Sequence, residues 1–160
     1  MDEILELLVK DARRSAEEIA KLVGKPVSDV KRKIAEYEKD GTILQYKTVL
    51  NDAQCESGSC VLALIEVSIT PQKDVGFDHI AERIYNFPEV KTCYLVSGGY
   101  DLQVIDEGRS IHTIGEFVAS KLSSMENVRR TSTHFLLKKY KEDGQIFKKS
   151  NKQKRLNISY

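Results

Sequence analysis

The sequence predicts an α+β protein built from two units, a small helical unit followed by a β-α-β-β-α-β unit. Two observations support this prediction. Apolar residues recur at helical spacing at the start of the chain and are followed by the helix-ending residues Gly24 and Gly41. Later in the chain, runs rich in β-branched residues alternate with helix-like runs. The expected divisions are a first domain 1–50, a linker 51–59, a second domain 60–144 and a basic C-terminal tail 145–160.

The composition is that of an ordinary globular protein. The chain has 160 residues, of which 41% are hydrophobic and 31% are charged. No apolar run approaches the roughly 18 residues that span a bilayer, because Glu66 interrupts the most apolar stretch. The acidic N-terminus also lacks the basic-then-apolar pattern of a signal peptide. We therefore expect a cytoplasmic protein.

Charge is unevenly distributed along the chain. Residues 1–50 contain ten basic and ten acidic side chains, residues 51–137 contain seven and twelve, and residues 138–160 contain eight and two. The middle is therefore poorly suited to nucleic acid, whereas the tail can add a diffuse attraction for it. The three cysteines form no CxxC pair and the three histidines are far apart in sequence. We expect reduced thiols, no metal site and no cofactor.

The first two helices are predicted by apolar spacing and a capping motif. Ile4 and Leu8 lie on one face of a short first helix. Ser15 and Glu18 fit a capping box, in which each side chain satisfies a backbone amide of the first turn. A second helix is therefore expected to begin directly after Ser15.

The third helix is the one around which the first unit is organised. Val30, Ile34 and Tyr37 form its apolar stripe, and Gly41 follows its expected end. Two helices joined by a short turn form a helix-turn-helix, whose second helix, here about Pro26 to Lys39, lies in the DNA major groove. On this stretch alone, a helical hairpin with a solvated basic patch is the alternative.

DNA contacts are expected from the polar side of this helix. Lys31, Arg32 and Lys33 lie between the stripe residues, where they can neutralise phosphates or read a guanine. Ser28, near the start of the helix, can reach a phosphate or a base edge. The β-rich segment Ile43–Leu50 then predicts a strand, which is either the wing of a winged helix-turn-helix or a strand leading away from it.

The second unit follows the order of the ferredoxin-like split motif. In that motif an antiparallel sheet has both helices on one face. The other face must be covered by something, and a second subunit is the natural candidate. The predicted elements are a strand 61–70, a helix 75–87, strands 90–97 and 100–105, a helix 111–122 and a strand 128–137.

The turn Gly98-Gly99-Tyr100-Asp101 has a structural and a functional interpretation. A tight hairpin turn favours glycines whatever the protein does. A bound amino acid, however, has a carboxylate that needs amide donors and an ammonium that needs an acceptor. Exposed glycine amides and the Asp101 carboxylate offer both.

These features together resemble the Lrp/AsnC (leucine-responsive/asparagine regulator) family of prokaryotic transcription factors. The resemblance extends over residues 2–140 and rests on the segments VGKPVSDVKRKIAEYEKDGTILQY, EVKTCYLVSGGYDL and NVRRTSTHFLLKKYK. It implies a DNA-binding domain joined to an amino-acid-sensing domain of the RAM type, and homodimers that assemble into tetramers or octamers. One departure is Lys25-Pro26-Val27, which stands where the family often has a Ser or Thr cap.

The resemblance places the effector pocket around the glycine hairpin. The last strand supplies the hydroxyl groups of Thr131, Ser132 and Thr133, which can face the same pocket. Alternation allows only every second one to do so, and we favour Thr131 and Thr133. The expected effector contacts are Gly98, Gly99, Tyr100, Asp101, Thr131 and Thr133.

We therefore predict a DNA-binding transcriptional regulator that responds to a small effector, in the first place an amino acid. One alternative is an architectural DNA-binding protein without an effector. Another is an enzyme like the sirohaem decarboxylases, which have the same pair of folds. There, His112, His134, Arg129 and Arg130 would hold propionates or transfer protons. Because no paired carboxylates or nucleophile–base spacing is present, we predict no enzymatic activity and no catalytic residue.

Overall fold

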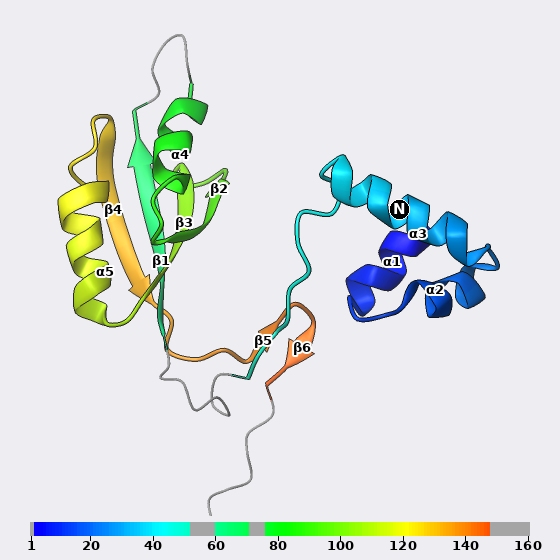
Figure 1. The fold of residues 1–160 in the computed structure, drawn as a ribbon. Coiled ribbons are helices and arrows are strands. Elements are labelled where there is room, and N and C mark those ends of the chain that lie inside the picture. Colours follow the sequence, from blue (N-terminus) through cyan, green and yellow to red (C-terminus); the bar gives the residue numbers. More distant parts are fainter. Residues whose placement is uncertain (1, 52–59, 71–75, 148–160) are drawn as a thin grey trace, which may run out of the picture. The chain divides into compact units, whose positions relative to one another are not determined.

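The chain divides into two compact units in the computed structural model, residues 1–49 and 50–160 (Figure 1). The structure describes residues 2–51, 60–70 and 76–147. Most of the predicted linker, Cys55 and most of the predicted basic tail therefore lie outside the described residues. Each unit is described by itself below.

The first unit consists of three helices, α1 (Glu3–Lys10), α2 (Ala16–Val23) and α3 (Val27–Lys39). The predicted capping box is confirmed at the start of α2. The Ser15 backbone N–H donates to the Glu18 carboxylate at 2.8 Å, and the Glu18 N–H donates to the Ser15 hydroxyl oxygen at 3.2 Å. These reciprocal bonds satisfy two amides that a helix start otherwise leaves without a partner.

A small apolar core fixes how α2 and α3 face each other. Ile4, Ile19 and Val30, one from each helix, are completely or almost completely buried. The turn between α2 and α3 contains Gly24, whose φ of 68° is in the left-handed region that a glycine adopts without a steric penalty. Because Val30 points into this core, the polar side of α3 points outward.

Helix α3 begins one residue after Pro26, the start that the sequence predicts. Pro26 occupies the N-cap position, with φ −59° and ψ 142°, and helical geometry begins at Val27. No side chain caps this end. The fixed φ of proline suits a helix start. Because proline has no N–H, this helix end also has one fewer backbone amide that needs a hydrogen-bond partner.

The predicted strand over Ile43–Leu50 is wrong. These residues belong to no strand, and the described part of the first unit contains none. The segment is instead held locally, since the Ile43 N–H donates to the Tyr37 carbonyl at 2.8 Å and the Tyr46 hydroxyl donates to Glu38 at 2.9 Å. A strand exists only with a neighbouring strand to complete its hydrogen bonds, and β-propensity alone supplies no such partner.

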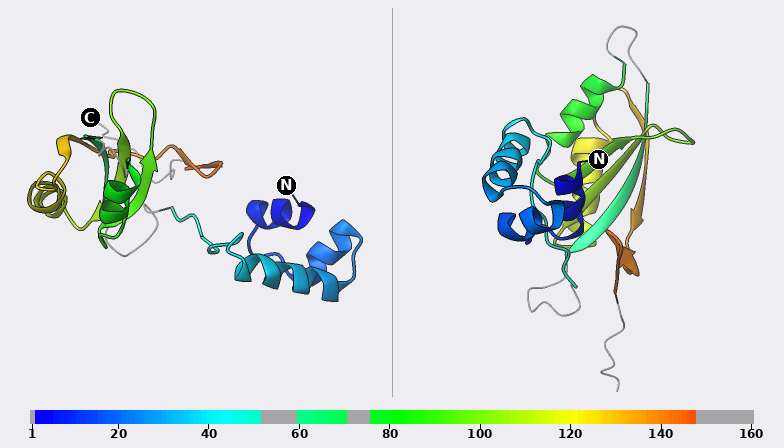
Figure 2. Two further views of the ribbon diagram at one scale, coloured as in Figure 1. Left: turned by 90° about the horizontal axis from the view of Figure 1, so that it is seen from above. Right: turned by 90° about the vertical axis from the view of Figure 1, so that its right-hand side faces the viewer.

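The second unit confirms the predicted β-α-β-β-α-β order. Its sheet has the strand order β2-β3-β1-β4, and every neighbouring pair is antiparallel. Both helices cover the same face of this sheet (Figures 1 and 2). The elements are β1 (Val61–Ile69), α4 (Asp78–Tyr85), β2 (Val90–Leu95), β3 (Leu102–Gly108), α5 (Ile111–Phe117) and β4 (Val128–Phe135).

Two local features were not predicted. The helix of α5 continues as one π-helical turn, η2 (Val118–Leu122), in which the Ser123 N–H donates to the Val118 carbonyl at 2.8 Å. After β4, a hairpin forms from β5 (Lys141–Glu142) and β6 (Gln145–Ile146). Residues 145 and 146, which the sequence analysis placed in the basic tail, thus belong to this hairpin.

Alternation along β1 decides which face of the sheet is buried. Ala63, Ile65 and Val67 are fully buried and pack in the core shared with both helices. The residues between them, including Leu64 and Glu66, are only half-buried and lie on the face that neither helix covers. We call this surface the open face.

Asp106 on β3 is the one buried charged residue in the described core. Its side chain is 1% exposed, and neither carboxylate oxygen has a hydrogen-bond partner among the described residues. Burial, and then the nearby negative charge of Glu89, raise the pKa of Asp106 from 3.8 to about 6. The folded chain therefore binds this proton more tightly than the unfolded chain does.

We predict that Asp106→Asn stabilises the chain at neutral pH. Because the folded pKa is raised, stability is lost as pH rises from about 4 through about 6, by up to about 3 kcal/mol for this shift. The amide cannot ionise, so urea denaturation should give the variant little advantage at pH 3.5, about 1.5 kcal/mol at pH 5 and about 3 kcal/mol at pH 7.5.

The matched control is Glu107→Gln, which removes the same charge from the adjacent residue. Glu107 is half-buried and forms an ion pair with Lys91 at 3.2 Å, so its loss should bring no gain. Equal pH dependence of stability in wild type and Asp106→Asn would contradict the prediction.

Candidate functional site

Three consecutive cations in the middle of α3 are accessible to solvent. The side chains of Lys31, Arg32 and Lys33 are 61%, 71% and 44% exposed. Ser28, which lies one helical turn before Arg32, is also exposed. Each cation is paired within the unit: Lys31 Nζ lies 2.7 Å from Glu17 Oε1, Arg32 Nη2 lies 3.0 Å from Asp29 Oδ1, and Lys33 Nζ lies 3.1 Å from Glu36 Oε2.

This arrangement suits contact with an extended anionic surface. The two helices α2 and α3 are joined by a short turn, and the second of them has 13 residues with its cations facing outward. A helix of this kind fits the major groove, with cations able to reach phosphates and base edges. All four residues expected to contact DNA lie on α3 and are accessible or partly accessible.

The glycine hairpin between β2 and β3 is tied to the end of β1 by Asp101. The Asp101 N–H donates to the Val67 carbonyl at 3.0 Å, and its carboxylate accepts the Ile69 N–H at 2.8 Å. One carboxylate oxygen of Asp101 thus has a structural role. The tip residues Gly98 and Gly99 remain exposed.

Beside this hairpin, the open face contains a small hollow of about 70 Å³. Strand register explains why its residues meet. Glu66 on β1 is opposite Ser132 on β4, and Ser68 is opposite Arg130. Residues opposite each other in a sheet point to the same face, and the hairpin closes one side of the hollow. Its lining residues are Glu66, Ser68, Gly99, Tyr100, Arg130 and Ser132.

Opposite charges line this hollow. Glu66 lies 3.4 Å from the ring of His134, and within the described part of the chain Arg130 makes no ion pair. The two charged side chains therefore share a hollow without pairing with each other. The Tyr100 hydroxyl donates to Gln103 at 2.8 Å, which orients its ring.

The structure separates the other expected effector contacts from the hollow. Thr131 and Thr133 are opposite Val67 and Ile65, so they point to the helix-covered face. The Thr131 hydroxyl lies 3.0 Å from that of Ser123, at the end of η2, in agreement with this placement. Of the six expected contacts, only Gly99 and Tyr100 line the hollow.

Comparison with known proteins gives the two units separate and consistent matches. A family model described as winged helix-turn-helix DNA-binding matches residues 3–43. A second, described as the Lrp/AsnC ligand binding domain, matches residues 62–146, which is more than half of the chain. This chain belongs to the Lrp/AsnC family. It is a DNA-binding transcriptional regulator with an effector-binding domain.

Individual relatives agree with this Lrp/AsnC assignment. The uncharacterised HTH-type transcriptional regulator YugG of Bacillus subtilis is 44% identical over 157 residues, covering 98% of this chain and 95% of that protein. A transcriptional regulator of Neisseria meningitidis, solved as a complex with L-Met, is 26% identical with a TM-score of 0.68, covering 88% and 89%. AsnC of Escherichia coli shares the fold, with 22% identity, a TM-score of 0.65, and 86% and 89% covered.

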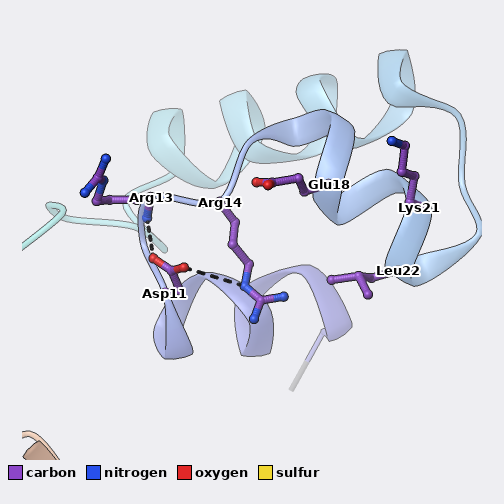
Figure 3. Close-up of a pocket in the computed structure, with 6 residues that line it drawn as sticks. All are labelled: Asp11, Arg13, Arg14, Glu18, Lys21 and Leu22. Carbon is purple, nitrogen blue, oxygen red and sulfur yellow. Dashed lines mark hydrogen bonds and ion pairs between the residues drawn. The ribbon is translucent and has the colours of Figure 1, made fainter.

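A larger hollow of about 680 Å³ lies on the helical unit of this Lrp/AsnC chain (Figure 3). Both of its carboxylates interact within the unit: Asp11 accepts the Arg13 backbone N–H at 3.0 Å and lies 4.0 Å from Arg14. Glu18 belongs to the capping box. None of its lining residues comes from α3, so it is separate from the polar side described above.

The two histidines named for an enzyme of the sirohaem decarboxylase type do not come together. His134 is opposite Leu64 on the open face, whereas His112 is an exposed residue of α5 in the helix layer. Among the described residues, no group of three or more His, Cys, Asp or Glu side chains is placed to hold a metal ion. No helix in the same described ranges is long and apolar enough to cross a membrane.

Sequence reasoning missed most of the residues that line the hollow. Glu66 was noted only as an interruption of an apolar run, and Arg130 only for the enzyme alternative. Alternation offered a signal, because Glu66 and Ser68 occupy positions that alternate with the buried residues of β1. Which polar positions on β4 would lie opposite them depended on the register between two strands far apart in sequence.

Proposed function

We propose that this regulator senses a free amino acid, which binds by its charged head group in the hollow beside the glycine hairpin. The observation that supports this proposal is the presence of Glu66 and Arg130 in one small hollow without an ion pair between them. A zwitterion brings one group for each, an ammonium for the carboxylate and a carboxylate for the guanidinium.

The remaining lining residues suit the same ligand. Arg130 is a forked donor that matches a carboxylate, and the exposed backbone at Gly99 offers a further amide. Ser68 and Ser132 supply hydroxyl groups between the charged ends. Gly98 and Asp101 lie in the adjoining hairpin, where the second oxygen of Asp101 can assist with the ammonium.

The size of the hollow favours recognition of the head group. About 70 Å³ is far smaller than the several hundred Å³ that typically hold a whole ligand. The ammonium and carboxylate fit inside, and the ligand side chain extends beyond them. The Neisseria meningitidis relative in complex with L-Met supports an amino acid as the class of effector.

We propose further that the open face is the interface of a homodimer. Leu62, Leu64 and Ile105 lie half-buried on this face, and the helices cover only the other one. A sheet with one apolar face uncovered in the monomer buries that surface by pairing with another copy. Dimers of this kind then assemble into a tetramer or octamer, as the family resemblance implies.

Effector and assembly are coupled in this proposal because the hollow lies on the same open face. A ligand in the hollow stabilises the assembly state that binds it more tightly. It changes the equilibrium between two assembly states only by the difference in its affinity for them. Assembly sets the spacing of the α3 helices, and hence their fit to half-sites about one helical turn apart.

For DNA binding, α3 lies in the major groove with Ser28, Lys31, Arg32 and Lys33 as contacts. A regulator of this kind acts in the cytoplasm, where prokaryotic DNA is accessible. Gene regulation by binding requires no catalysis, and we propose that the protein is not an enzyme. An architectural role without effector remains the second candidate, favoured only if the hollow binds nothing.

The first prediction from this proposal concerns DNA. Arg32→Ala should weaken binding of the full chain to a duplex selected from a random library by about tenfold, and should reduce the dependence of log affinity on log salt by about 1. Arg32 is 71% exposed, so the change leaves the core intact.

Fluorescence anisotropy at several salt concentrations measures both quantities. The control is Arg83→Ala, which removes the same charge from an exposed position on α4. If both variants lost affinity equally, α3 would not be the contact surface.

The second prediction concerns the effector. Calorimetry of the full chain with each common amino acid should identify a ligand, and Arg130→Gln and Glu66→Gln should each weaken it by about ten- to a hundredfold, since each removes a charge-assisted hydrogen bond. Two analogues of that amino acid, one without the carboxylate and one without the ammonium, should be weakened to a similar degree.

Thr133→Val is the matched control, because Thr133 lies on the same strand as Arg130 but on the opposite face. Binding that survives Arg130→Gln but is lost in Thr133→Val would place the effector on the helix side instead. Absence of binding by all amino acids would favour the architectural role.

The third prediction concerns assembly. Leu64→Lys on the open face should lower the mass measured by light scattering to that of a folded monomer. Tyr85→Lys, at a 53% exposed apolar position on α4, should leave the mass unchanged. An unchanged mass for Leu64→Lys, with circular dichroism like that of wild type, would exclude the open face as the interface.

A further inference from the structure

The helical unit has no excess of positive charge, although it is the DNA-binding unit. Residues 1–50 contain ten basic and ten acidic side chains, whereas a DNA-binding domain usually presents a basic patch. The sequence-independent part of DNA affinity comes from cations that replace counterions on the phosphates. The balance of charge in this unit therefore limits that part of the affinity.

The balance is also local. Of the four cations of α3, the three that lie in its middle, Lys31, Arg32 and Lys33, each have a carboxylate within 2.7–3.1 Å, and the fourth is Lys39 in the last turn. Lys33 additionally lies over the ring of Tyr37, 4.9 Å from its centre. A phosphate that approaches any of these three paired cations must first replace the carboxylate beside it.

The pair between Glu17 and Lys31 differs from the other two. Asp29–Arg32 and Lys33–Glu36 are neighbours three residues apart on α3 itself. Glu17 comes from the first turn of α2, so this pair crosses from one helix of the helix-turn-helix to the other. The hydrogen bond from Lys31 also lowers the pKa of Glu17, which keeps this carboxylate ionised.

We propose that Glu17, together with Asp29 and Glu36, attenuates DNA binding by holding three of the four cations of α3, Lys31, Arg32 and Lys33, in ion pairs. A single helix-turn-helix is thereby kept too weak to occupy DNA alone, and tight binding requires several units in one assembly. This inference rests on the proposed function in one respect, namely that α3 is the surface that meets DNA.

The strength of these pairs fits attenuation rather than a block. The Lys31 and Glu17 side chains are 61% and 54% exposed, and exposed pairs of this kind change an equilibrium by only about two- to fivefold each. Two linked units multiply their effects on affinity. A modest penalty on each unit therefore makes occupancy of DNA strongly dependent on assembly, and hence on the effector that controls assembly.

The test is Glu17→Gln in the full chain, titrated with a fluorescent mixed-sequence duplex at several salt concentrations. Freed of its partner, Lys31 should contact phosphate. We expect about two- to fivefold tighter binding per unit, and a slope of log affinity against log salt that is steeper by about 1 per unit. A purely structural role for Glu17 would not increase the slope.

Two further variants make the result specific. Glu17→Asp keeps the charge and should retain the wild-type slope. Glu6→Gln removes the same charge from an exposed position on α1 that forms no ion pair among the described residues, and its slope should also be that of wild type. Equal tightening by Glu6→Gln and Glu17→Gln would overturn the proposal, because net charge alone would then explain the result.

Failure of this inference and failure of the proposed function can be distinguished. If Arg32→Ala weakens binding but Glu17→Gln changes neither affinity nor slope, α3 meets DNA and the attenuation is wrong. If Arg32→Ala has no effect either, α3 is not the surface that contacts DNA, and the proposed attenuation is then wrong as well.

Discussion

The central strand β1 is the constraint on which the second unit, the effector-binding domain, depends. It hydrogen-bonds to β3 on one side and to β4 on the other, and its alternation separates a buried face from an open one. Ala63, Ile65 and Val67 anchor both helices through the burial of apolar surface, the dominant favourable term in folding. The same alternation places Glu66 and Ser68 on the other face, beside the glycine hairpin. Core and candidate effector site are thus the two sides of one strand.

The two units differ in where their notable charged side chains lie and in whether these side chains are paired. In the second unit, Asp106 is buried without a partner and beside Glu89, so burial favours its protonated form. In the helical unit, the cations of α3 lie in solvent and are paired with carboxylates at short distance. The buried group affects stability and its dependence on pH, whereas the exposed pairs affect what the surface can bind.

Much of the fold could be predicted because it depends on local patterns. Ser15 and Glu18 signal the start of α2, Gly24 signals its end, and the order of strands and helices identifies the ferredoxin-like unit. The prediction of a strand over Ile43–Leu50 was wrong because, in the described chain, no neighbouring strand pairs with this segment despite its β-propensity. The η2 turn and the β5–β6 hairpin were missed because each depends on details of hydrogen bonding that periodicity does not report.

By itself, the sequence determined the family, the order of the elements and the helix that presents Lys31, Arg32 and Lys33, since these follow from local spacing and motifs. Only the tertiary structure decided which residues meet. Register between β1 and β4 placed Arg130 with Glu66 and turned Thr131 and Thr133 to the helices, because a shift by one residue exchanges the two faces of a strand. Helix packing likewise brought Glu17 to Lys31. Such contacts join residues far apart in sequence, and no local pattern specifies them.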